Sequence, residues 1–268
     1  MSSYVELTYF QVGLAALLIA INGVISVVLH LRMERSLLIA SLRTVVQLLL
    51  VGLVLEWVFR LERWYVVMGL ATIMTLIAGV TAASRNERRY PGIWTNTIIS
   101  VWASAWIVTA FALLAVVQGT DKWYQPQYAI PLLGMVLGNA LNGVSVGLNT
   151  FTESLVTRRE QVESLLALGA TRWEAARGPV QHAVRTGMIP VINSMMVVGI
   201  VSLPGMMTGQ LVSGMAPIQA VKYQIVIMFL IASATALGTV GVVLLTFLRV
   251  FNTQHQFRSE LLSRFRKR

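Results

Sequence analysis

Seven mostly apolar stretches follow one another along this chain, each with roughly the 20 residues that a helix needs to cross a bilayer. Because the hydrocarbon core holds no water, a segment that crosses it must pair its own peptide groups, and each stretch is therefore predicted to be an α-helix. We expect an all-α, polytopic integral membrane protein with about seven transmembrane helices. The expected spans are Leu7–Leu29, Leu37–Phe59, Tyr65–Ala83, Ile93–Val117, Tyr128–Asn149, Ala183–Leu203 and Tyr223–Leu248.

Composition supports the membrane class. Of the 268 residues, 56% are hydrophobic and only 12% are charged, whereas soluble globular domains carry about 25% charged residues. The net charge of +10 is typical of nucleic-acid binders, but the basic residues cluster between the spans, as the positive-inside rule explains. We therefore expect the lipid bilayer, and no nucleic acid, as a partner. The absence of cysteine excludes disulfides and thiolate metal sites.

The orientation follows from the distribution of Lys and Arg. Of these 21 residues, 16 lie in one alternate set of connections and in the C-terminal segment, 4 lie in the opposite set, and one, Arg43, lies within a span. Connections rich in Lys and Arg stay in the cytoplasm. The N-terminus is therefore predicted outside and the C-terminus inside, in a multi-pass protein of the inner (plasma) membrane.

The longest polar connection, Thr150 to His182, lies between the fifth and sixth spans. Its apolar residues recur at helical spacing with charged residues on other faces, a pattern that indicates an amphipathic helix. Gly169 and Gly178-Pro179 are predicted to end helical segments. We expect a cytoplasmic helix, a turn and a helix that re-enters the membrane. The first helix either lies on the bilayer surface or binds a cytoplasmic partner.

The stretch Val191–Pro217 begins as an apolar helix and is predicted to break at Leu203-Pro204-Gly205. A Gly- and Met-rich segment without charge follows, which is either backbone held at membrane depth or a short outer loop. Its methionines offer either soft sulfur to a metal or apolar packing. The candidate pathway or packing residues in this stretch are Asn193, Pro204, Gly205, Met206, Met207 and Gly209.

Polar residues within other spans are further candidates for the pathway or for helix packing. Arg43 either reaches the cytoplasmic interface or faces the bundle, hydrogen-bonded to Gln47 one turn on. Asn139 and Asn142 lie in a glycine-containing run of the fifth span, which is typical of close helix packing. No carboxylate lies in the middle of a span, which weighs against a proton-coupled carrier, and no metal ligands can be assigned.

Two segments carry a family resemblance. The run from Glu163 to Thr171 reads ESLLALGAT, and the run from Ile200 begins IVSLPGMMTGQLVSGMAP. Together they resemble the FetB-type iron-export permeases of ABC transporters, a family that also includes plant aluminium-tolerance permeases. The resemblance implies one permease domain, residues 1–268, that works as a homodimer with a cytoplasmic ABC ATPase and exports iron or another metal. It assigns coupling to a segment at about 150–182, with the docking residues Glu163, Leu166, Gly169, Ala170 and Thr171.

The chain lacks an ATP site of its own. A P-loop places a lysine directly after a glycine, and none of the three lysines, Lys122, Lys222 and Lys267, follows a glycine. We therefore expect a non-enzymatic transport subunit without a bound cofactor, with ATP and Mg on the partner ATPase. Two alternatives remain: an ATPase-independent channel or secondary carrier, and a non-transporting membrane subunit that recruits a cytoplasmic partner.

Overall fold

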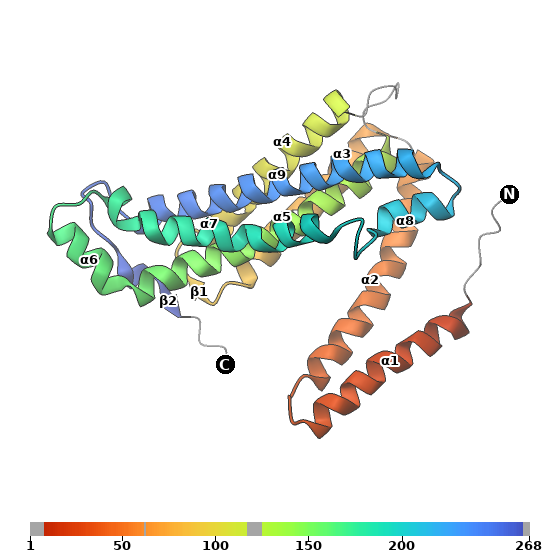
Figure 1. Ribbon diagram of the computed structural model, residues 1–268, viewed down its shortest axis with the longest axis horizontal. Helices are drawn as coiled ribbons and strands as arrows, with labels where there is room; N and C mark the ends of the chain where they lie inside the picture. The colour runs from red at the N-terminus through yellow and green to blue at the C-terminus, as the bar shows by residue number, and fades with distance from the viewer. Residues whose placement is uncertain (1–7, 62, 117–124, 265–268) are drawn as a thin grey trace.

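The computed structural model describes residues 8–61, 63–116 and 125–264, and these residues are mostly helical (Figure 1). A π-helical turn, Ala112–Val116, continues α4, and a 3₁₀ turn, Ser259–Leu261, lies near the end of the described chain. The two short strands β1 (Arg88–Arg89) and β2 (Ser263–Arg264) pair antiparallel. The helices are α1 (Tyr9–Val28), α2 (Glu34–Leu61), α3 (Trp64–Ser84), α4 (Ile93–Phe111), α5 (Pro126–Thr157), α6 (Arg159–Ala167), α7 (Arg172–Val197), α8 (Gly205–Val212) and α9 (Pro217–Val250).

The predicted all-α, polytopic class is confirmed. In the described part of the chain, six helices are long and apolar enough to cross a membrane: α1, α2, α3, α4 with its π-helical turn, α5 and α9. The sixth expected span, Ala183–Leu203, falls on α7, which is long enough but too polar to count among them. Leu7 and Val117, predicted at span ends, lie outside the described residues.

Helix α7 corrects two sequence predictions. It runs through Gly178-Pro179 without ending, because packing against α5 and α9 holds it despite the lost backbone donor. It ends at Val197 rather than Leu203, because Gly199 takes a left-handed φ of +81° and breaks the helix before Pro204 is reached.

Helix α5 is the centre of the bundle and packs against α3, α4, α7 and α9. Its 32 residues are long enough to cross the bilayer and extend beyond it on one side. Large apolar side chains, among them Leu148, Phe151 and Leu155, are fully buried along it. The main hydrophobic cluster joins these side chains to residues of α3, α4, α7 and α9.

Glycines allow α5, α7 and α9 to approach closely at one level. A Cβ on Gly187 of α7 would lie 2.7 Å from Thr239 Cγ2 of α9 and 2.9 Å from the Gly143 carbonyl of α5. Gly143 itself faces Thr235 and Thr239 at similar range. Side chains cannot be accommodated at such separations, so small residues set the helix spacing here. Gly138, one turn and a half earlier, has open space around it.

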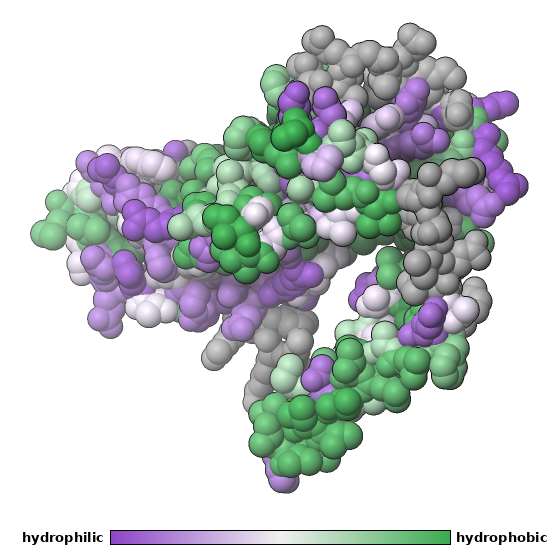
Figure 2. Space-filling view, turned by 45° about the vertical axis from the view of Figure 1, so that its right-hand side comes forward, coloured by the Kyte–Doolittle hydropathy of each residue, from purple (hydrophilic) through white to green (hydrophobic). Residues whose placement is uncertain are grey.

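The hairpin of α1 and α2 extends away from the bundle (Figure 1). Of the residues in the most apolar segment of α1 only 6% are buried, and in that of α2 none are. Figure 2 shows the resulting hydrophobic surface over the hairpin. Near its end α2 joins the bundle through Val58, which packs with Val67 of α3 and Ile130 of α5. Such a surface is stable only against lipid or another protein.

Segments predicted to be cytoplasmic meet at one end of the bundle. The strand pair joins the α3–α4 connection to the C-terminal segment, and Arg249 Nε donates to the Pro91 carbonyl (3.1 Å). The hydroxyls of Tyr90 and Thr246 share a hydrogen bond (2.8 Å). These contacts put the basic connections on a common side, as the charge distribution requires.

Gly143→Ala is expected to destabilise the protein by about 1–3 kcal/mol, because the added methyl overpacks the contact with Thr235. Gly138→Ala in the same helix is the control, and its open surroundings predict unchanged or higher stability. Thermal unfolding of both variants in detergent makes the comparison. Equal melting temperatures would contradict the assigned packing.

Cysteines introduced at Gln127 and Ser164, both exposed, are expected to react with a membrane-impermeant maleimide from opposite sides. The first position is the second residue of α5, and the other lies on α6, which the charge distribution assigns to the cytoplasm. The chain is free of native cysteine, so labelling reports these positions alone. Labelling of both in intact cells would overturn the orientation.

Candidate functional site

A tight turn joins α6 to α7 at the end of the bundle that the charge distribution assigns to the cytoplasm. The Ala170 N–H donates to the Leu165 carbonyl and the Gly169 N–H to the Leu166 carbonyl (3.0 and 3.1 Å). Gly169 has a φ of +91°, so this is the Schellman arrangement in which glycine ends a helix. The turn lies at Gly169, where the sequence predicts it. Glycine is favoured there because the residue has a left-handed backbone conformation.

The next helix begins with a capping box. The Thr171 hydroxyl accepts from the Glu174 N–H (3.3 Å), and the Glu174 carboxylate accepts from the Thr171 N–H (2.7 Å) and hydroxyl (2.8 Å). These bonds, first that from the backbone, lower the pKa of Glu174. The stabilisation by this cap is therefore present at neutral pH and is lost as the pH falls through that lowered pKa.

The turn presents apolar surface to water. Leu168 is 85% exposed, and Leu165 and Trp173 are also exposed. We call these three residues the apolar tip. Of the residues to which the resemblance assigns docking, Glu163 accepts from Arg159 Nε (2.6 Å) on the face of α6, while Leu166 packs against the bundle. An exposed apolar tip on a well-capped turn is typical of a protein contact.

The apolar tip is fastened to the end of α9. The Arg172 N–H donates to His255 Nδ1 (3.0 Å), and Arg172 Nη1 donates to the Asn252 carbonyl (3.1 Å). Trp173 packs edge-on against Phe247, with ring centroids 5.6 Å apart. A force applied to the tip therefore acts on α7 and α9 together.

A polar stripe runs along α5 and faces out of the bundle. Its residues recur three or four positions apart, which places them on one face of a helix, and they are exposed or half-buried. Asn139 bonds its own helix, with Nδ2 donating to the Met135 carbonyl (2.9 Å). The polar residues of the stripe are Asn139, Asn142, Asn149 and Glu153, and the apolar Val146 lies between the second and third of them.

Arg85 lies beside this stripe although the sequence assigns it to a loop. As the C-cap of α3, it reaches across so that Nη1 donates to Asn142 Oδ1 (2.8 Å). The two residues border a recess of about 430 Å³ between α3, α5 and α7. Sequence reasoning found Asn142 but missed Arg85, Ser145 and Asn149. Ser145 and Asn149 could have been found from the sequence, because they lie at helical spacing from Asn142 along α5. The recess lining is Arg85, Asn142, Ser145, Val146, Asn149 and Pro190.

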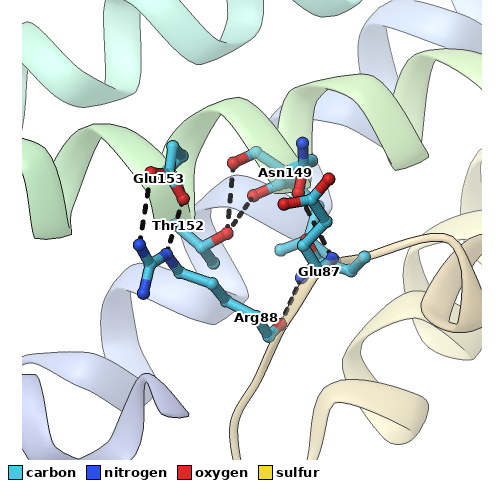
Figure 3. A network of polar contacts seen from close by, with 7 residues as sticks. Glu87, Arg88, Asn149, Thr152 and Glu153 are labelled. Atoms are coloured by element: carbon cyan, nitrogen blue, oxygen red, sulfur yellow. Dashed lines mark hydrogen bonds and ion pairs between the residues drawn. The ribbon is translucent and has the colours of Figure 1, made fainter. Parts of the chain in front are cut away.

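Below the recess, polar contacts hold the α3–α4 connection against α5 (Figure 3). Arg88 donates to Glu153 from Nε and Nη2 (2.6 and 3.2 Å), a bidentate ion pair. The Glu87 N–H donates to Asn149 Oδ1 (3.4 Å). The carboxylate of the stripe is thus paired with Arg88, while the recess above it retains the Arg85 charge.

The helical path is broken between α7 and α8. After α7 ends, residues 198–204 turn and α8 continues toward the end at which α9 begins (Figure 1). Met206 packs with Val191 of α7 and with Ile227 of α9, which lies about 15 Å along that helix. The start of α8 is therefore held against α7 and α9, and Ile200 within the break is 87% exposed.

The remaining candidates take different places. Pro204 is the N-cap of α8, Gly205 begins it and Gly209 lies within it, both glycines in open surroundings. Met207 is half-buried and Asn193 is exposed on α7.

Arg43 and Gln47 are exposed on α2 and do not line the recess, and no hydrogen bond joins them, unlike in the second of the two alternatives for Arg43. Among the described residues, His, Asp and Glu form no group of three that could hold a metal.

Comparisons with known proteins cover most of the chain. The model of the uncharacterised protein family UPF0014 matches residues 9–251. The UPF0014 membrane protein slr1647 of Synechocystis is 39% identical over 84% of this chain and 86% of its own length. The probable iron export permease protein FetB of Escherichia coli is 30% identical, over 94% and 95%. Protein ALUMINUM SENSITIVE 3 of Arabidopsis thaliana is 29% identical, over 93% and 90%. No solved structure matches.

Gly169→Ala is expected to loosen the turn before α7, because a Cβ at a φ of +91° costs about 1 kcal/mol. Hydrogen exchange at the amides of Gly169 and Ala170 should accelerate roughly fivefold. Gly178→Ala is the control, since Gly178 lies inside α7 with open space around it. Equal exchange in both variants would show that glycine is not required at the turn.

Proposed function

Because the chain belongs to the UPF0014 family of membrane proteins, as its resemblance to FetB-type permeases predicted, we propose that it is the permease subunit of an ABC exporter. In this proposal a separate cytoplasmic ATPase binds ATP with Mg and supplies the energy. The permease provides the path across the bilayer. Its cargo is iron or another metal, as the printed name of the Escherichia coli relative suggests for that protein.

The observation that carries the proposal is the apolar tip. Leu168, Leu165 and Trp173 expose apolar surface at an end of the molecule that is rich in Arg and Glu and belongs in water. A single exposed leucine needs no explanation, but two leucines and a tryptophan exposed around one Schellman turn form a compact apolar knob. A helical knob of this kind fits a groove on a partner protein. We assign that groove to the ATPase.

The tip has a mechanical connection to the membrane. Helix α7 starts at the tip and runs 26 residues, about 39 Å, to the break, which in this proposal lies at membrane depth. Broken helices at such depth are a recurrent feature of transporters, where they line the pathway. Movement of a docked ATPase would therefore reach the pathway through one continuous helix.

A second copy of the chain completes the pathway in this proposal. Amides and an arginine that face out of a bundle at membrane depth are costly against lipid. The polar stripe of α5 with Arg85 is such a surface. Two copies that face each other across it would enclose a polar path. Two permeases with two ATPase subunits is the arrangement that the resemblance implies.

The test is recovery of an ATPase with the tagged permease, followed by ATP-dependent metal flux in proteoliposomes. Leu168→Asp should reduce recovery at least tenfold, because it places a charge in an apolar contact. The control is Thr157→Asp, which adds the same charge at an exposed position, the last residue of α5, two positions before α6 begins. Both variants should insert in the membrane equally.

Two results would contradict the proposal, and each points elsewhere. Metal flux by the permease without any ATPase would indicate a channel or secondary carrier. Normal ATPase recovery without ATP-dependent flux of any tested metal would indicate a subunit that recruits a partner and does not transport.

A further inference from the structure

The recess between α3, α5 and α7 contains hydrogen-bond donors whose acceptor partners are missing. Arg85 uses Nη1 to bond Asn142 Oδ1, which fixes that amide with its oxygen toward Arg85 and its nitrogen outward. The Glu87 N–H likewise occupies Asn149 Oδ1. Within the described chain, neither amide nitrogen bonds a protein acceptor. The amide oxygens are thus occupied and their N–H groups remain available.

Ser145 adds an independent observation. Its side chain is only 7% exposed, it lines the recess, and its Oγ has no hydrogen-bond partner in the described residues. Buried hydroxyls are nearly always paired, because an unpaired one loses its bonds to water without compensation. The Oγ atom itself exposes less than 1 Å², so a rotation about χ1 is required before this hydroxyl can bond a molecule that enters the recess.

The charge of the recess is positive. Among described residues, no carboxylate lies within 4 Å of the Arg85 guanidinium, whereas the neighbouring Arg88 is paired with Glu153. No acidic side chain lines the recess. Asn142 lies about 24 Å along α5 from its outer end, so the recess occupies the cytoplasmic half of a hydrocarbon core about 30 Å thick. An unpaired guanidinium attracts anions more strongly there than in water.

From this geometry we propose that the recess binds an oxyanion, a carboxylate or phosphate group, of the solute that the protein exports. Arg85 supplies the charge, and Asn142, Ser145 and Asn149 supply neutral donors to the remaining oxygens. A bare metal cation would meet a positive charge and amide oxygens that are already bonded. A metal cargo therefore enters as an anionic complex with a carboxylate-bearing chelator. This identification of the solute rests on the proposed export function, whereas oxyanion binding itself does not.

The test is calorimetric binding of citrate, inorganic phosphate and Mn²⁺ alone to the purified permease in phosphatidylcholine nanodiscs. Citrate or phosphate should bind, and Mn²⁺ alone should not compete. Arg85→Gln should weaken anion binding about 10- to 100-fold, the loss expected for a charge-assisted hydrogen bond, with Arg85→Lys intermediate. Arg177→Gln is the control, because Arg177 is exposed on α7 and does not line the recess.

Ser145→Ala separates binding from folding. Removal of an unpartnered buried hydroxyl should leave thermal stability unchanged or raised, while anion affinity falls about threefold to tenfold. A purely structural serine would not show this opposite pair of effects.

Three results would overturn the proposal. The first is absence of anion binding by the folded wild type, and the second is equal binding by Arg85→Gln and Arg177→Gln. The third is loss of citrate binding when phosphatidylglycerol replaces phosphatidylcholine. That result would show that the recess binds an anionic lipid headgroup. None of these measurements uses an ATPase, so a failure here is distinct from a failure of Leu168→Asp to release the partner.

Discussion

A bilayer cannot hydrogen-bond to a buried polar group, and the arrangement of this protein depends on that constraint. Most hydroxyls along the spans meet it locally, by donating to the carbonyl one turn earlier. Thr75 bonds Ala71, Thr235 bonds Ile231 and Thr246 bonds Val242 in this way. These threonines behave as small, nearly apolar residues and allow helices to approach. The polar stripe of α5 meets it differently. Asn139 bonds its own helix, whereas Asn142, Asn149 and Glu153 bond the segment that begins at Arg85. Polar groups that depend on a partner from another element are the positions at which function is expected.

The sequence predicted most of the helical scaffold, because apolar length is a property of continuous segments. For α3 the expected Tyr65–Ala83 differs by one residue at each end from the observed Trp64–Ser84. The turn at Gly169 was also predictable, since glycine ends helices by local backbone geometry. The end of α7 was not, because two breakers lie close together there. Gly199 ends α7, whereas Pro204, which looked like the stop, precedes the start of α8.

The recess could not be predicted from the sequence because its residues come from elements that end at different depths. Helix α3 ends at Ser84, level with the middle of α5, and the following connection runs along α5 as far as Glu153. Counting charges places Arg85 with the other loop arginines, and the predicted orientation uses it only in that way. Only the difference in length between α3 and α5 brings its side chain to Asn142, 57 positions away. Sequence spacing identified one wall of the site, and the tertiary arrangement supplied its charge.

The position of the glycine contact on α7 constrains how the protein can move. Gly187 is held against Gly143 and Thr239, and Pro190 of the recess lies only three residues beyond it. Thr171 lies about 24 Å from Gly187 on one side and Gly199 about 18 Å on the other. A tilt of α7 about this contact would displace both ends of the helix by much more than the recess wall. A partner that moves the turn before α7 would thus shift the break after Val197, while the donors around Arg85 keep their geometry. Binding and gating are then separate properties of the same helix, because its tightest packing lies next to the recess and far from both ends.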